Sequence, residues 1–327
     1  MKPKVIVYKK IDTTVLAYLS ENCEVTYFET LDSQSLPSFY QELKNATGII
    51  GSGLKVDAKL LDLAPQLKVI SNISVGYDNL DMPEISKRNI MATNTPEVLN
   101  DSVADTIFGL LLATARRMPE LNQLVKSGGW TAQVGEGLYG VDVHHKKLGI
   151  IGMGGIGSAI AKRAHFGFDM PILYHNRSRN TEAEQTFQAT YYSLEELCQQ
   201  ADFICLMTPL TPNTVKLIGE KEFKLMKKTA IFVNGSRGAT VDEDALVHAL
   251  QNGEILAAGL DVFAQEPVSP DHPLLGMDNV VTLPHIGSAT HETRLKMANL
   301  AAESLVIGLQ GKMPQTLINQ EVFAEVQ

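Results

Sequence analysis

Residues 148–157 read LGIIGMGGIG, an apolar run that leads into a glycine-rich turn. Gly152, Gly154 and Gly157 have the spacing GxGxxG: the first glycine permits a tight turn, the second lets the backbone approach a pyrophosphate, and the third lets helix and strand pack closely. Because a strand pattern precedes the turn and a helix pattern follows it, the stretch predicts a dinucleotide-binding unit rather than a flexible loop. The pyrophosphate is expected at the helix N-terminus, beside Gly152, Gly154, Gly155, Ile156 and Gly157.

The next predicted strand, residues 172–175, ends in residues that bear on the type of cofactor. An NAD site usually has Asp or Glu at this strand end to bind the ribose hydroxyls. Here the chain continues with Asn176, Arg177 and Ser178, so no carboxylate would repel a 2′-phosphate, and an arginine can pair with one. The sequence predicts NADPH as the preferred cofactor, with weaker use of NADH. The alternative is that Arg177 and Arg179 are ordinary surface residues.

Short apolar runs alternate with amphipathic ones on both sides of the glycine turn. Strands are expected at 4–8, 47–51, 68–71, 148–152, 172–175, 203–207, 230–234, 257–261 and 280–283. This alternation predicts an α/β protein with parallel sheets. A strongly apolar helix over 103–118, with Asn100 or Asp101 as its N-cap, separates two series. We expect a cofactor domain over 103–288, and a substrate domain built from 1–102 together with the final helix in 289–327.

Three polar residues lie just after predicted strands of the second series, where ligands bind to open parallel sheets. They are Arg237, Glu266 and His285. A histidine can supply the proton that an alkoxide needs after hydride reaches a keto carbon. A neighbouring carboxylate holds the imidazole and favours its charged form, and an arginine can bind a substrate carboxylate through two hydrogen bonds. Singly, each residue has a structural explanation; together they predict carbonyl reduction.

Composition excludes several other functions. The 327 residues carry a formal net charge of −9, which disfavours nucleic-acid and membrane-surface binding. The three cysteines, Cys23, Cys198 and Cys205, have no CxxC spacing, so neither a disulfide framework nor a zinc site is expected. No apolar run approaches the ~18 residues of a membrane span, and the N-terminal apolar run is too short for a signal peptide. We expect a cytoplasmic protein without a metal.

Several motifs in order resemble those of the D-isomer-specific 2-hydroxyacid dehydrogenases over nearly the whole chain. The matching segments are SVGYDN at 74–79, VADT at 103–106, ARR at 115–117, the glycine turn, NGSRG at 234–238, AGLDVF at 258–263 with Glu266-Pro267, and PHIGSAT at 284–290. The chain resembles most the branch whose members reduce glyoxylate, hydroxypyruvate and 2-ketogluconate. One departure is Gly155, where many relatives have arginine.

The resemblance implies two Rossmann-like, doubly wound domains with an interdomain cleft, and a homodimer held largely by the cofactor domain. It implies that His285 is the proton donor, Glu266 its partner and Arg237 the substrate anchor, with Val75 and Gly76 offering backbone N–H groups to the substrate carboxylate. The further cofactor contacts that it implies are Thr106, Thr208, Pro209, Gly235, Asp261 and Gly287.

Two alternatives remain beside an NADPH-dependent reductase of small 2-oxo acids. One is an NADH-dependent enzyme of the same family that acts on another 2-hydroxy acid. The other is a cofactor-sensing binding protein of the same fold, since related corepressors work through protein partners. The intact set of Arg237, Glu266 and His285 favours the enzyme, and residues 175–179 favour NADPH.

Overall fold

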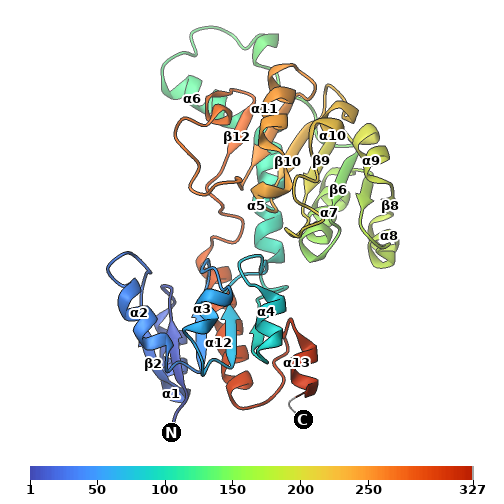
Figure 1. The fold of residues 1–327 in the computed structure, drawn as a ribbon. Helices are drawn as coiled ribbons and strands as arrows, with labels where there is room; N and C mark the ends of the chain where they lie inside the picture. Colours follow the sequence, from blue (N-terminus) through green and yellow to red (C-terminus); the bar gives the residue numbers. More distant parts are fainter. Residues whose placement is uncertain (326–327) are drawn as a thin grey trace. The chain divides into compact units, whose positions relative to one another are not determined.

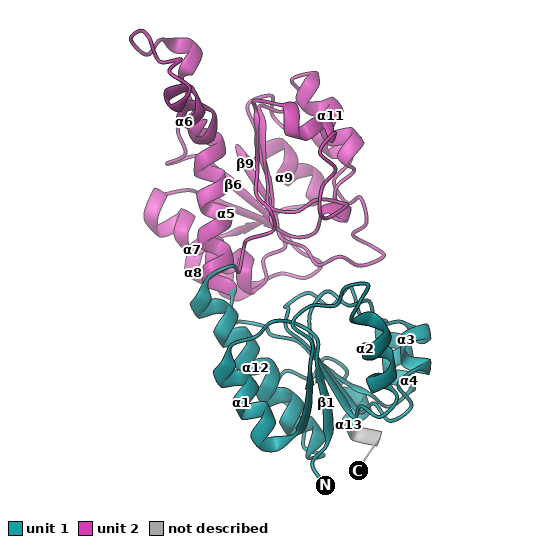
Figure 2. Ribbon diagram, turned by 90° about the vertical axis from the view of Figure 1, so that its left-hand side faces the viewer, with its two compact units in different colours: residues 1–99, 289–327 teal, residues 100–288 magenta. Residues whose placement is uncertain are grey.

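The computed structural model describes residues 1–325 and divides into two compact units (Figure 2). Unit 1 consists of Met1–Leu99 and the residues from Ala289 onward, and unit 2 of Asn100–Ser288. Among the described residues, no helix has both the length and the apolar character needed to cross a bilayer. Within the same range, no group of three or more His, Cys, Asp or Glu side chains is placed to hold a metal ion.

Unit 1 is built on a five-stranded parallel sheet with the order β2-β1-β3-β4-β5. Its elements are β1 (Lys4–Val7), α1 (Thr13–Asn22), β2 (Glu24–Tyr27), α2 (Leu36–Leu43), β3 (Gly48–Gly51), α3 (Ala58–Asp62), β4 (Val69–Asn72), α4 (Met82–Lys87), β5 (Met91–Thr93), α12 (His291–Leu309) and α13 (Gln320–Glu325). Helices α1 and α12 cover one face of the sheet, and α2, α3 and α4 cover the other (Figure 2). Both faces are therefore buried, which explains why the central strands are almost wholly apolar.

Unit 2 is built on a seven-stranded parallel sheet with the order β12-β11-β10-β9-β6-β7-β8. Its strands are β6 (Leu148–Ile151), β7 (Ile172–His175), β8 (Thr190–Tyr191), β9 (Phe203–Leu206), β10 (Ile231–Asn234), β11 (Ala257–Leu260) and β12 (Val280–Thr282). Its α-helices are α5 (Asn100–Ala115), α6 (Met118–Lys126), α7 (Gly155–Phe168), α8 (Thr181–Phe187), α9 (Leu194–Gln200), α10 (Glu220–Leu225) and α11 (Glu243–Gln251) (Figure 1). Helices α5 and α7 pack together, and the buried side chains of α9, α10 and α11 form a core with the sheet.

Helix starts follow from local capping chemistry. The Asp12 side chain accepts a hydrogen bond from the backbone N–H of Thr14 and so begins α1. Ser193 and Glu196 form a reciprocal capping box at the start of α9, which satisfies two donors that have no partner within the helix. Thr290 caps α12 by accepting from the backbone N–H of Thr293.

The predicted α/β class with two parallel sheets is confirmed, and every predicted strand is present within one or two residues. The strands that the sequence did not predict are β2, β5 and β8, all at sheet edges, where partial exposure weakens the apolar signal. The predicted extension of the long helix to residue 118 is wrong. Helix α5 ends at Ala115, and Arg117 adopts a left-handed backbone with φ 54° before α6 begins. The predicted N-cap is also wrong, because Asn100 is the first helical residue.

Candidate active site

The glycine turn connects β6 to α7 with the geometry that a pyrophosphate site requires. Gly152 has φ 103°, and a Cβ atom there would lie 2.7 Å from the carbonyl carbon of Met207. A Cβ on Gly157 would lie 2.3 Å from the carbonyl oxygen of Gly152, so helix and strand can approach only with glycine at this position. Gly154, in contrast, has no atom within 4 Å of its ideal Cβ. The turn is therefore tight on its protein side and open at the helix N-terminus, which fits an anionic ligand.

Gly155 lies against the side chain of Asn100, a contact that the sequence did not predict. An ideal Cβ at this position would lie 2.5 Å from Nδ2 of Asn100, the first residue of α5. The amide of Asn100 thus occupies the space into which a side chain at position 155 would begin. An arginine there would require Asn100 to move.

The residues after β7 differ in whether their side chains already form hydrogen bonds or ion pairs within the protein. The Asn176 side chain bonds to both backbone groups of Met153, accepting from its N–H at 2.7 Å and donating to its carbonyl at 3.2 Å. Arg179 forms a two-bond ion pair with Glu184, each bond 2.8 Å long. Arg177 is exposed, and none of the described side chains pairs with it. Arg177 is thus the arginine of this stretch that is available to a ligand.

Other predicted cofactor residues lie along the same edge of the unit 2 sheet. The Oγ1 atom of Thr208, after β9, is buried and has no hydrogen-bond partner within residues 1–325, which leaves a donor for a ligand. The carbonyl of the neighbouring Pro209 accepts from Thr214 Oγ1 at 2.7 Å. Thr106 Oγ1 lies 3.3 Å from the carbonyl oxygen of Gly287. Gly235 has no room for a side chain, because its Cβ would lie 2.3 Å from Ile107.

The structure brings Glu266 and His285 together. Nδ1 of His285 and Oε2 of Glu266 are 2.7 Å apart, while Oε1 of Glu266 accepts from the backbone N–H of Phe263 at 3.0 Å. Glu266 therefore orients the imidazole, and Nε2 of His285 has no partner in the described part of the chain. His285 has φ 54°, a strained conformation for a residue other than glycine that is often found at functional sites.

Opposing effects act on the pKa of the Glu266 carboxyl. Desolvation by burial raises it, whereas the hydrogen bonds from His285 and Phe263 and the positive charges of His285 and Arg237 lower it. The net direction is downward. Glu266 is consequently a carboxylate at neutral pH, which suits it to hold a charged imidazole.

Arg237 follows β10 on a turn that its neighbours hold firmly. The Asn234 side chain donates to the carbonyl of Arg237 at 3.1 Å and accepts from the backbone N–H of Ser236 at 3.0 Å. Gly238 then touches the segment after β11, because a Cβ there would lie 1.8 Å from the carbonyl carbon of Phe263. This close approach carries the positive charge of Arg237 near enough to Glu266 to lower the pKa of the carboxyl.

Asp261 has a role that the sequence did not predict. It is buried, and its two carboxylate oxygens accept from the backbone N–H groups of Ile286 and Gly287 at 2.8 and 3.0 Å. Burial raises the pKa of Asp261, while these two hydrogen bonds lower it. Asp261 thereby anchors the loop that carries His285. Its contact with the cofactor remains a prediction.

Val75 and Gly76 lie in unit 1, in the loop that follows β4. Their carbonyl groups accept hydrogen bonds from the side chains of Asn94 and Asn72, at 2.8 and 2.9 Å. Their N–H groups donate to no other group among residues 1–325. The loop therefore presents two fixed backbone donors, as a site for a carboxylate requires.

Comparisons with known proteins agree with this geometry. The model of the D-isomer-specific 2-hydroxyacid dehydrogenase NAD-binding domain matches residues 108–287. The chain is 51% identical over 322 residues to the glyoxylate/hydroxypyruvate reductase B of Escherichia fergusonii, with 98% of this chain and 99% of the relative covered. It is 51% identical over 324 residues to the reductase of the same name from Enterobacter sp. (strain 638), covering 99% and 100%.

Two solved structures extend the comparison. The TT0316 protein of Thermus thermophilus has a TM-score of 0.88 at 39% identity, covering 96% of this chain and 99% of that one. An NADPH-dependent glyoxylate/hydroxypyruvate reductase from Sinorhizobium meliloti, in complex with NADP and malonate, has a TM-score of 0.86 at 34% identity, covering 97% of each chain.

Proposed function

The chain belongs to the D-isomer-specific 2-hydroxyacid dehydrogenase family, and from this premise we propose that it uses NADPH to reduce glyoxylate, hydroxypyruvate and 2-ketogluconate to D-2-hydroxy acids. That it is an NAD(P)-dependent oxidoreductase acting on small 2-oxo acids follows from the family and from the reductases it resembles. The observation that supports the proposed chemistry best is the 2.7 Å contact between His285 and Glu266.

Each of the three polar residues has one role in the proposed reaction. The bound nicotinamide cofactor supplies the hydride that reaches the keto carbon. As the new C–H bond forms at the keto carbon, the π electrons of the carbonyl group move to its oxygen. His285 then donates the proton on Nε2 to that oxygen. Glu266 keeps the ring oriented and stabilises its charged form before the transfer. Arg237 and the N–H groups of Val75 and Gly76 would hold the substrate carboxylate.

The turn residues would hold the cofactor without contributing chemistry. The free N–H groups at the start of α7 suit a pyrophosphate, and the unpartnered hydroxyl of Thr208 can donate to a phosphate or ribose oxygen. Arg177, with Ser178 beside it, would pair with a 2′-phosphate.

A preference for NADPH carried by Arg177 is the first expected result. One arginine–phosphate pair at a partly exposed site is worth roughly 1.5–3 kcal/mol, about 10- to 150-fold in affinity, so Arg177→Ala should lower kcat/KM for NADPH by that factor and leave NADH nearly unchanged. Arg179→Ala is the matched control, because Arg179 is already paired with Glu184. Equal kcat/KM values for the two cofactors in the unmutated chain would refute the assignment.

A substrate panel tests the reaction itself. Glyoxylate, hydroxypyruvate, pyruvate and 2-ketogluconate are offered with NADPH and with NADH, and cofactor oxidation is followed by its absorbance. Turnover of glyoxylate and hydroxypyruvate is expected. Tight cofactor binding without oxidation on any 2-oxo acid would instead favour a cofactor-sensing protein.

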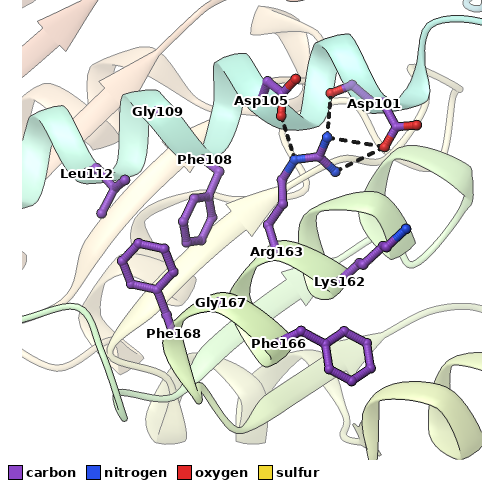
Figure 3. A pocket seen from close by; sticks show the side chains of 10 residues that line it. All are labelled: Asp101, Asp105, Phe108, Gly109, Leu112, Lys162, Arg163, Phe166, Gly167 and Phe168. Atoms are coloured by element: carbon purple, nitrogen blue, oxygen red, sulfur yellow. Dashed lines mark hydrogen bonds and ion pairs between the residues drawn. The ribbon is translucent and has the colours of Figure 1, made fainter.

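An exposed apolar surface on unit 2 supports a homodimer. Residues 118–140, here called the arm, contain α6 (Figure 1). No residue of α6 is buried. The large apolar side chains of the arm that are more than half exposed are Met118, Val125, Trp130, Val134 and Tyr139. A hollow of about 640 Å³ between α5 and α7 presents the exposed Phe166 and the partly exposed Phe168, beside an Arg163 that Asp101 and Asp105 hold (Figure 3). Apolar surface of this kind marks a protein interface, and we infer that a second copy covers it.

The proposed dimer interface can be tested by measuring the mass of the protein in solution. The unmutated chain should sediment as a dimer at micromolar concentration, and Trp130→Glu should shift it toward the monomer, because a charge would be buried in the interface. Leu256→Glu is a control, since Leu256 is also partly exposed but lies on unit 2 outside the arm. A monomeric unmutated chain would exclude this interface.

A further inference from the structure

Three polar side chains lie at the carboxyl edge of the unit 1 sheet. Lys9 follows β1, Ser52 follows β3, and Arg294 lies in the first turn of α12. Lys9 Nζ donates a short hydrogen bond to Ser52 Oγ. None of these residues belongs to the glycine turn or to the set of Arg237, Glu266 and His285.

The direction of α12 explains why Arg294 comes to this edge. Near the helix end, Leu305 lies beside Gly48, the first residue of β3. One turn earlier, the carbonyl of Ala301 accepts from Ser71 in β4. Helix α12 therefore runs antiparallel to the strands, and its N-terminal turn lies where β1 and β3 end. In parallel sheets that edge is where ligands bind.

The cluster formed by Lys9, Ser52 and Arg294 contains two cationic side chains and no acidic one. Burial lowers the pKa of Lys9, and the positive charge of Arg294 lowers it further. Burial alone lowers the pKa of Arg294. Within residues 1–325, no carboxylate pairs with Lys9 or Arg294. Two partly buried like charges without a counter-ion destabilise a fold, so the arrangement needs an explanation.

Two other basic residues of unit 1 are paired with acidic side chains, which is the usual arrangement. Lys10, next in the chain, is exposed and pairs with Glu29 at 2.6 Å. Arg88 is held by Glu84 and Asp62 at 2.9 and 2.7 Å. Lys9 and Arg294 thus differ from these cations in lacking an acidic partner while being partly buried, which is the pattern of a site kept for an external anion.

We propose that Lys9, Ser52 and Arg294 form an anion-binding site in unit 1, which takes a carboxylate or phosphate group that is either free in solution or carried by a 2-oxo acid. The guanidinium can bind two oxygens of such a group, and the ammonium of Lys9 and the hydroxyl of Ser52 can each donate one more bond. The origin of the anion from the substrate rests on the proposed function; the site itself does not.

The first test measures anion binding to the full chain. Inorganic phosphate, compared with chloride at equal ionic strength, should raise the Tm of the unmutated protein in a saturable way. Lys9→Met and Arg294→Met should abolish that rise, while Lys10→Met should keep it. Without phosphate, Arg294→Met should not lower the Tm, because it removes an uncompensated charge and retains the aliphatic stem; a purely structural arginine would lower it. A phosphate effect equal in all four proteins would overturn the site.

The second test asks where the anion comes from. Hydroxypyruvate and its 3-phosphate ester differ only in the distal group, so the ratio of their kcat/KM values isolates this group. Lys9→Met and Arg294→Met should lower the ratio of ester to parent at least tenfold, with glyoxylate nearly unaffected. An unchanged ratio, with phosphate still bound, would mean that the site takes a free anion and that the substrate-borne assignment is wrong. An equal loss on glyoxylate would also overturn that assignment. If the unmutated chain reduces no 2-oxo acid, the proposed function fails, and the Tm test still decides the anion site.

Discussion

Arg237→Ala is expected to lower kcat/KM for glyoxylate by about 30- to 1000-fold, which corresponds to roughly 2–4 kcal/mol of lost transition-state stabilisation. The guanidinium is proposed to bind the substrate carboxylate and to polarise the adjacent keto group. The turn should survive the substitution, because Asn234 and Thr240 bond to the carbonyl of residue 237, and not to its side chain. The loss should therefore appear in kinetics, with little change in Tm.

Arg237→Lys separates geometry from charge. Lysine keeps the positive charge but lacks the planar fork that binds two carboxylate oxygens, so most of the loss should remain. Lys216→Ala is a suitable control, because Lys216 also lies in unit 2 but is exposed and pairs with Asp242. Near-normal kcat/KM in Arg237→Lys would show that a point charge is enough and would remove the bidentate role.

The parts of this molecule that the sequence predicted are those encoded by short contiguous patterns. The glycine turn is one, since the positive φ of Gly152 and the close contact of Gly157 with Gly152 both arise within six residues. The central strands are another, because burial on both faces leaves a continuous apolar run. The edge strand β8 lacks that pattern, with both of its residues exposed.

The parts that the sequence did not predict depend on contacts between distant segments. Asn100 meets Gly155 only because α5 packs on α7. Asp261 anchors the loop at Gly287 across two neighbouring strands, β11 and β12. An acid that directly follows a buried strand was the available signal for the anchoring role of Asp261, whereas the resemblance implies only a cofactor contact. Gly238 was part of a quoted motif, but the need for glycine there appears only when Phe263 is placed against it.

Removing the imidazole is expected to have the largest effect of all. Asn tolerates a left-handed backbone, so His285→Asn should fit the observed φ of 54° while removing the proton donor. Loss of a general acid typically costs 10²- to 10⁴-fold, and kcat for reduction should fall by about that factor. Cofactor affinity, measured by fluorescence, should change little, which separates a catalytic role from a defect in folding or binding.

The pH dependence then tests the partnership of His285 with Glu266. The pKa of Glu266 is lowered in the fold, so its carboxylate persists to acidic pH and can hold a protonated imidazole there. Reduction consumes the proton on His285, so it should be fast at lower pH and fall as pH rises; oxidation of the 2-hydroxy acid, which needs a neutral imidazole, should rise instead. Glu266→Gln removes the negative charge that favours the protonated imidazole, so the falling limb should move to lower pH. Asp142→Asn, which alters the exposed pair of Asp142 and His144, should leave the profile in place. A reductive kcat/KM that rises steadily from about pH 6 to 9 would exclude His285 as the proton donor.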